Sequence, residues 1–123
     1  MKILITDDIF TNRLLLSEIV EDLGHQHIEA ENGKIAIESL MTNDDINLIL
    51  MDIEMPVMNG IEATRHIRRM MTPPKNNIPI VALTAHNPKI FFDNYKDVGF
   101  DQLLTKPYSV QKIMNMLEAF IKK

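Results

Sequence analysis

The stretch I-N-L-I-L-M-D-I-E-M-P-V-M-N-G, residues 46–60, decides how the chain is expected to fold. It begins as a short, nearly unbroken apolar run and ends in turn residues. Such a run is typical of a strand buried on both faces, as in parallel sheets. Asp52 then stands at the carboxyl end of the strand, where open α/β sheets bind their ligands. The stretch therefore predicts a buried strand that presents a carboxylate at a binding edge.

Outside this stretch, apolar runs and helical patterns alternate along the whole chain. Short apolar runs predict further strands at residues 3–6, 27–30, 78–83 and 100–105. Apolar residues at helical spacing predict a helix after each strand, the first capped by Thr11 and the others near residues 33–41, 61–71, 88–98 and 110–121. Five such alternations predict one α/β domain over residues 1–123, a doubly wound parallel sheet with helices on both faces.

The first helix carries an apolar stripe and a polar side. The stripe predicted to be buried consists of Leu15, Ile19 and Leu23, with Leu16 and Val20 beside it. A polar side of this kind is ordinarily a solvated helix face. The residues on the polar side are Asn12, Arg13, Glu18 and Glu21.

The composition excludes several classes of function. Thirteen Lys and Arg residues against seventeen Asp and Glu residues give a formal charge of -4, and no basic block could neutralise a nucleic-acid backbone. Zero cysteines exclude disulfides and thiolate zinc sites. The longest apolar runs fall far short of the ~20 residues that a membrane span requires, and no secretory signal is visible. We therefore expect a cytoplasmic protein without membrane insertion and without a nucleic-acid partner.

Chemically active side chains stand at or just past four of the predicted strand ends. Parallel strands joined by right-handed crossovers bring their carboxyl ends to one edge of the sheet, so these side chains are expected to converge. The converging residues are Asp7, Asp8, Asp52, Thr84 and Lys106.

This set of side chains predicts a magnesium site and a nucleophile. Three carboxylates repel one another unless a cation lies among them, and hard oxygen ligands suit Mg²⁺. A carboxylate can also accept a phosphoryl group, while a metal ion and an ammonium group offset the phosphoryl charge. Asp52 is the candidate nucleophile and Lys106 the cation, and Thr84 would offer its hydroxyl to a phosphoryl oxygen.

The chain resembles the response-regulator receiver domains of two-component and phosphorelay signalling, the CheY-like family. The resemblance covers the whole chain and implies a flavodoxin-like sheet in the order 2-1-3-4-5. It also implies Mg²⁺-dependent transfer of phosphate from a histidine kinase or histidine phosphotransfer protein to Asp52, which alters the binding of an unknown downstream protein. The receiver would catalyse its own phosphorylation and slow dephosphorylation rather than turn over an external substrate. The matching motifs are Asp7-Asp8, M-D-I-E-M-P-V-M-N-G at 51–60, P-I-V-A-L-T-A-H at 79–86, and Lys106-Pro107.

The resemblance also implies roles for individual residues. Asp8, Asp52 and the backbone carbonyl of Glu54 would ligate the metal, and Asp7 would act through a bound water. The Lys106-Pro107 bond would be cis, Glu54 and His86 would stand at the positions that tune dephosphorylation, and the first helix would dock the histidine-bearing partner. Many receivers carry a switch aromatic where this chain has Leu103, so the signal is expected to leave by another route.

Other interpretations remain open from the sequence. The chain is either a free-standing receiver without an output domain or a receiver from a hybrid kinase, and it is expected to be a monomer or weak dimer. A phosphohydrolase of the haloacid dehalogenase type also uses an aspartyl nucleophile, Mg²⁺ and a Lys. Such enzymes require a second Asp, the general acid, at the position that Glu54 occupies in this chain. A receiver that binds partners without phosphorylation is disfavoured by the complete acidic set.

Overall fold

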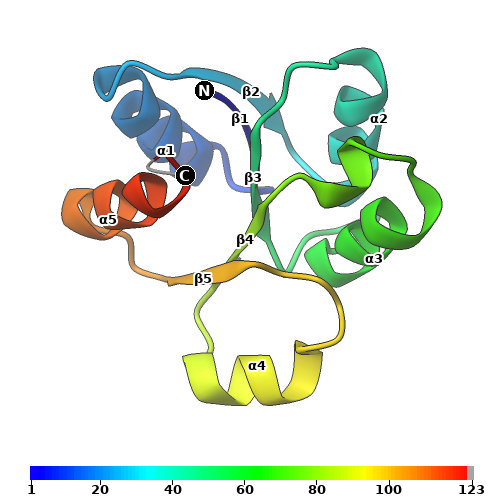
Figure 1. Ribbon diagram of the computed structural model, residues 1–123. Helices are drawn as coiled ribbons and strands as arrows, with labels where there is room; N and C mark the ends of the chain where they lie inside the picture. Colours follow the sequence, from blue (N-terminus) through cyan, green and yellow to red (C-terminus); the bar gives the residue numbers. More distant parts are fainter. Residues whose placement is uncertain (122–123) are drawn as a thin grey trace.

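The computed structural model describes residues 1–121, and residues 122–123 of the expected domain lie outside the described part. Strands and helices alternate along the chain as the sequence predicts (Figure 1). The five strands form one parallel sheet in the order β2-β1-β3-β4-β5, which confirms the expected order. The elements are β1 (Lys2–Thr6), α1 (Phe10–Asp22), β2 (Gln26–Ala30), α2 (Gly33–Thr42), β3 (Leu48–Asp52), α3 (Gly60–Met70), η1 (Lys75–Asn77), β4 (Ile80–Thr84), α4 (Pro88–Tyr95), β5 (Gln102–Thr105) and α5 (Val110–Ile121).

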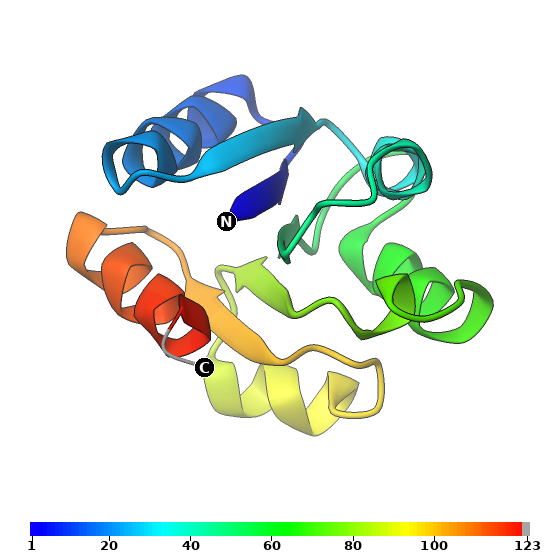
Figure 2. The same ribbon diagram turned by 45° about the horizontal axis from the view of Figure 1, so that its top comes forward.

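Helices cover both faces of the sheet. In Figures 1 and 2, α1 and α5 lie on one side, α2 and α3 lie on the other, and α4 lies next to β5. Successive strand residues point to opposite faces, so Ile3 and Leu50 join the core under α1 and α5, whereas Leu4 and Ile49 join the core under α2 and α3. Every residue of β3 is buried, as the apolar run in this strand predicts.

Helix α1 differs from its prediction in two respects. It begins at Phe10, and its N-cap residue is Ile9, without a side-chain cap, so the expected cap at Thr11 is wrong. Its buried face is formed by Leu16, Ile19 and Val20 with Ser17, while Leu15 and Leu23 of the predicted stripe are 41% and 36% exposed. The apolar residues of α1 occupy more than one side of the helix, so spacing alone could not identify the buried one.

The turn that follows β3 is held close to the strand by Gly60. The Gly60 N–H donates to the carbonyl of Ile53 over 2.9 Å, and a Cβ added to Gly60 would lie 2.1 Å from the carbonyl oxygen of Asp52. Only glycine permits such a close approach of two backbones. Asn59 and Glu62 then form a capping box that starts α3.

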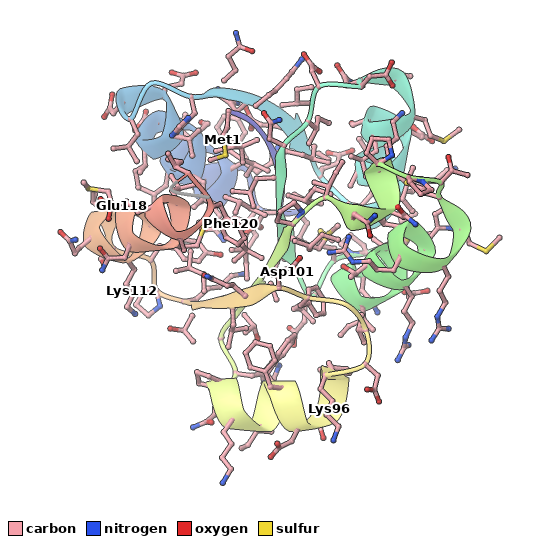
Figure 3. The ribbon with its side chains drawn as sticks, viewed as in Figure 1. Met1, Lys96, Asp101, Lys112, Glu118 and Phe120 are labelled. Atoms are coloured by element: carbon pink, nitrogen blue, oxygen red, sulfur yellow. The ribbon has the colours of Figure 1, made fainter. Side chains whose placement is uncertain are left out.

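The opposite end of the sheet is fastened by the guanidinium group of Arg68 in α3. It donates to the carbonyls of Gly99, Asn76 and Ile78 at 3.0, 2.8 and 2.8 Å and to Asp101 at 2.9 Å. Asp101 lies where the chain enters β5, after the loop that follows α4 (Figure 3). Arg68 therefore joins the end of α3 to the segments that enter β4 and β5.

Helix α4 packs against the sheet through aromatic rings. Phe91 is buried, and its ring centroid lies 5.1 Å from that of Tyr95 and 5.6 Å from that of Phe100. The helix ends at Tyr95 and β5 begins at Gln102, so both elements are shorter than predicted. No helix within residues 1–121 is both long enough and apolar enough to cross a membrane.

Candidate functional site

Strand register brings three of the predicted site residues to one edge of the sheet. Asp52 ends β3 and pairs with Leu83, the residue before Thr84. Thr84 ends β4 and pairs with Thr105, the residue before Lys106. Asp52, Thr84 and Lys106 therefore lie at the ends of three neighbouring strands, as the sequence predicts.

Asp52 is a buried carboxylate held by two donors. Asp52 is only 3% exposed to solvent. Oδ1 of Asp52 accepts hydrogen bonds from the backbone N–H of Ile53 at 2.9 Å and from Nζ of Lys106 at 3.0 Å. Within residues 1–121 no hydrogen bond reaches Oδ2, so one oxygen of the carboxylate is available to a ligand or an electrophile.

The surroundings of Asp52 raise its pKa from 3.8 to about 6. Burial is the largest cause, because it disfavours the charged form, and repulsion by Asp7 adds to it. The hydrogen bond and charge of Lys106, together with the Ile53 N–H, lower the pKa and offset part of this rise. The carboxyl is therefore basic for an aspartate but still mostly ionised at neutral pH.

Asp7, Asp8 and Asp52 form an acidic cluster in which one carboxylate oxygen from each residue lies within 4.8 Å of the others. Asp7 and Asp52 are buried and Asp8 is exposed, so the cluster opens to solvent on one side. Hard carboxylate oxygens at this spacing fit a divalent cation such as Mg²⁺, which prefers a few protein ligands and several waters. Nζ of Lys106 lies 3.8 Å from Oδ2 of Asp7 and supplies positive charge on another side.

Asp7 is fastened by residues that sequence reasoning did not connect with the site. Its Oδ1 accepts from the N–H of Ile9 at 2.9 Å and its Oδ2 from Nδ2 of Asn12 at 3.3 Å. Nη1 of Arg13 donates to the backbone carbonyl of Asp7 over 2.7 Å. In the sequence, Asn12 and Arg13 are only polar residues of the first helix, and no local pattern connects Asn12 with the Asp7 carboxylate or Arg13 with the Asp7 carbonyl.

A cavity of about 350 Å³ opens in front of Asp52. Glu54 and His86 stand on its rim, and Nε2 of His86 lies 3.2 Å from Oε1 of Glu54, so this pair links the loops after β3 and β4. Oγ1 of Thr84 accepts a hydrogen bond from the N–H of His86 at 3.1 Å. The cavity is lined by Asp8, Ile9, Asp52, Ile53, Glu54, Thr84, Ala85, His86 and Lys106.

The loop after β3 has an unusual backbone at Val57. The φ angle of Val57 is 70°, and the N–H of Met58 donates to the carbonyl of Pro56 over 2.8 Å across it. A β-branched residue is strained in this left-handed region. The loop is held nonetheless, because the Gly33 N–H at the start of α2 donates to the carbonyl of Met58 over 3.0 Å.

The segment after β5 carries two features of the site. The Lys106-Pro107 bond is cis, as the resemblance implied. The hydroxyl of Tyr108 is buried without a hydrogen-bond partner in residues 1–121, and burial, followed by the charges of Asp7 and Asp52, raises its pKa. Leu103 is half-buried and packs against the apolar cluster of α4 that contains Phe91.

Comparison with known protein families gives a match over nearly the whole chain. The family model described as "Response regulator receiver domain" matches residues 3–118. The chain is 30% identical over 114 residues to two-component response regulator 24 from Arabidopsis thaliana, covering 93% of this chain and 79% of that protein. It is 33% identical over 117 residues to the sensor protein GacS from Pseudomonas syringae, covering 94% of this chain but only 13% of that protein.

Solved structures also superpose on the chain over nearly its whole length. Chemotaxis protein CheY4 from Vibrio cholerae superposes with a TM-score of 0.87 at 26% identity, with 97% of each chain covered. The receiver domain of a sensor histidine kinase from Pseudomonas aeruginosa gives a TM-score of 0.87 at 28% identity, covering 99% of this chain and 98% of that one. That structure is described with a magnesium ion coordinated in its active site cleft.

Proposed function

The chain belongs to the response regulator receiver domain family of two-component signalling, and from this premise we propose that Asp52 accepts a phosphoryl group from a phosphohistidine on a partner protein. The observation that carries the proposal is the environment of Asp52: a buried carboxylate with one free oxygen, two further carboxylates and an ammonium group around it. This combination supplies a nucleophile, a cation site and countercharge within one cavity.

The proposed transfer exchanges one bond to phosphorus for another. A carboxylate oxygen of Asp52 attacks phosphorus, the P–N bond to the histidine ring breaks, and the ring nitrogen retains the electron pair and is protonated. The raised pKa of Asp52, about 6, leaves the carboxylate ionised at neutral pH and makes it more basic than an ordinary aspartate. Lys106, 3.0 Å from Oδ1, is placed to contact a phosphoryl oxygen as negative charge moves to this edge of the sheet.

Asp7, Asp8 and Asp52, with the backbone carbonyl of Glu54, would hold Mg²⁺ beside Asp52. When bound, this cation supplies charge that offsets the negative oxygens of the phosphoryl group. Thr84 would turn its hydroxyl toward one of those oxygens. Water attack on phosphorus later returns the free carboxylate and inorganic phosphate, which ends the signal.

Helix α1 would receive the histidine-bearing partner. Phe10 at its start is 63% exposed, and Leu14 and Leu15 on the following turn are exposed as well. Leu15 and Asn12 also border a hollow shared with Lys106, Pro107 and Tyr108, which lies next to the site. Exposed apolar side chains beside a site of transfer favour a protein donor over a small metabolite.

Phosphorylation by a small donor tests this function. Acetyl phosphate with Mg²⁺ should add one phosphoryl group to the parent protein and to Asp93→Asn, a matched change on the exposed side of α4. Asp52→Asn should gain none, and a chelator should prevent the reaction in every variant. Intact-mass spectrometry reads the result. Equal phosphorylation of Asp52→Asn would refute the assignment, and rapid turnover of p-nitrophenyl phosphate would indicate a hydrolase instead.

A further inference from the structure

Arg13 reaches from α1 back to the segment that carries the acidic pair. Its Nη1 donates to the carbonyl oxygen of Asp7 at 2.7 Å, and its Nε lies 3.3 Å from Oε1 of Glu29. Its guanidinium carbon lies 5.8 Å from the centre of the Phe10 ring, close enough for a cation–π contact. The side chain is only 14% exposed. Arg13 is therefore held at three points, and one of them is the backbone of the candidate metal site.

The peptide between Asp7 and Asp8 depends on this contact. On its amino side, the Asp7 N–H donates to the carbonyl of Ala30 over 3.1 Å, which continues the pairing of β1 with β2. On its carboxyl side, the Asp7 carbonyl is bound by Arg13. Within residues 1–121, the Asp8 side chain makes no hydrogen bond or ion pair, and it is exposed. Its direction is therefore set by the backbone that Arg13 holds.

We propose that Arg13 is a positioning residue for the cation site: by holding the Asp7 carbonyl it fixes the Asp7-Asp8 peptide and directs the Asp8 carboxylate toward Asp7 and Asp52. This role rests on the proposed function, because it presupposes that the three carboxylates bind Mg²⁺. Arg13 touches neither the cation nor the phosphoryl group in this role. It acts through the backbone, as outer groups around metal ligands commonly do.

The sign of the effect on Mg²⁺ affinity separates this role from simple electrostatics. A guanidinium group near a cation site repels the cation, so removal of its charge alone would strengthen Mg²⁺ binding. Loss of positioning would weaken Mg²⁺ binding, because part of the binding free energy would then be used to order the Asp8 side chain. Loss of an outer partner typically weakens metal affinity by about 10-fold or more.

The test is calorimetric titration of the whole chain with Mg²⁺ at fixed pH and salt. Arg13→Gln should bind Mg²⁺ about 10-fold more weakly than the parent. Arg13→Lys, which can still donate one bond to a carbonyl, should recover part of this loss. Arg69→Gln removes the same charge from the exposed last turn of α3 and should stay within about twofold of the parent, because solvent screens distant exposed charges.

A second measurement excludes a merely structural effect. Thermal unfolding in chelator shows whether each variant folds, and should Arg13→Gln fail to fold, Arg13→Met, which keeps an apolar stem but cannot donate to the Asp7 carbonyl, provides the same comparison and should also bind Mg²⁺ more weakly. Unchanged or tighter Mg²⁺ binding by a folded Arg13 variant that lacks the donor to Asp7 would overturn the positioning role while leaving the metal site intact. Absence of Mg²⁺ binding by the parent would overturn the metal site itself, and the positioning role with it.

Discussion

Lys106 and Asp52 are separated by 54 positions in the sequence, yet Nζ of Lys106 donates to Oδ1 of Asp52 over 3.0 Å. The contact joins the ends of β3 and β5, which are not neighbours in the sheet, across the end of β4. It therefore depends on the whole strand order and on the register of two strand pairs. It also lowers the pKa of a carboxylate that burial and Asp7 raise.

Lys106→Met should raise the pKa of Asp52 above its value of about 6, because both contributions of Lys106 lower that pKa. An opposite charge at this distance changes a pKa by about one pH unit or more. Carboxyl ¹³C NMR as a function of pH, without divalent cations, measures it. Lys112→Met on the exposed side of α5 is the matched control. An unchanged or lower Asp52 pKa in Lys106→Met would contradict the assigned role.

Asp52 should make the folded protein less stable as the pH rises from about 4 to about 7. The unfolded chain, with a pKa of 3.8, loses this proton before the folded protein does, with a pKa of about 6. Below about pH 4 both states keep the proton and the penalty vanishes. Asp52→Asn should therefore raise the free energy of unfolding by on the order of 2 kcal/mol near neutral pH and by little near pH 4. Urea unfolding in chelator checks this, and an equal gain at both pH values would refute it.

Thr84→Ala should separate phosphorylation from its consequences. The Thr84 hydroxyl accepts the His86 N–H at 3.1 Å, so its rotation toward a phosphoryl group would release the loop that leads into α4. The Ala variant should still be phosphorylated, but the amide chemical shifts of residues 85–95 should change much less than in the parent. Thr72→Ala, in an exposed loop, should behave as the parent. Full-sized shift changes in Thr84→Ala would exclude this route.

Val57→Gly should stabilise the protein. The φ angle of 70° is costly for a β-branched residue and open to glycine, and Val57 is 77% exposed, so little packing is lost. The expected gain in the free energy of unfolding is about 1 kcal/mol. Val57→Ala keeps a Cβ and should gain less. Urea unfolding compares the two, and a Gly variant no more stable than the Ala variant would show that the backbone is not strained there.

Most of the fold was predictable because its elements follow local rules. The buried strand ending at Asp52 follows from a run of apolar residues, and the convergence of Asp7, Asp8, Thr84 and Lys106 follows from parallel alternation. The strand order and the cis bond came from the resemblance alone. The state of monomer or weak dimer stays a prediction.

The remainder depended on tertiary contacts. The cap at Thr11 was wrong because the side chain of Asp7 takes the Ile9 N–H and the helix begins one residue earlier than that cap. The contact of Arg13 with the Asp7 carbonyl requires α1 and the end of β1 to be placed in space, so polarity along the helix could not reveal it. The sequence did not predict the close approach of Gly60 to Asp52 either, because an Asn-Gly pair also occurs in ordinary turns that make no such contact.

The hydrogen bonds of Arg68 restrain the segment that follows α4, whereas the segment that precedes α4 is attached to the functional site. Arg68 of α3 binds Gly99 and Asp101 in the loop that follows α4, so the C-terminal end of α4 is held in place. The other end follows Thr84 and is joined to the loop after β3 through the exposed pair of His86 and Glu54. A small displacement of Thr84 would therefore rotate α4 about its C-terminal end. This rotation would change the exposed surface of α4 without an aromatic switch residue at position 103.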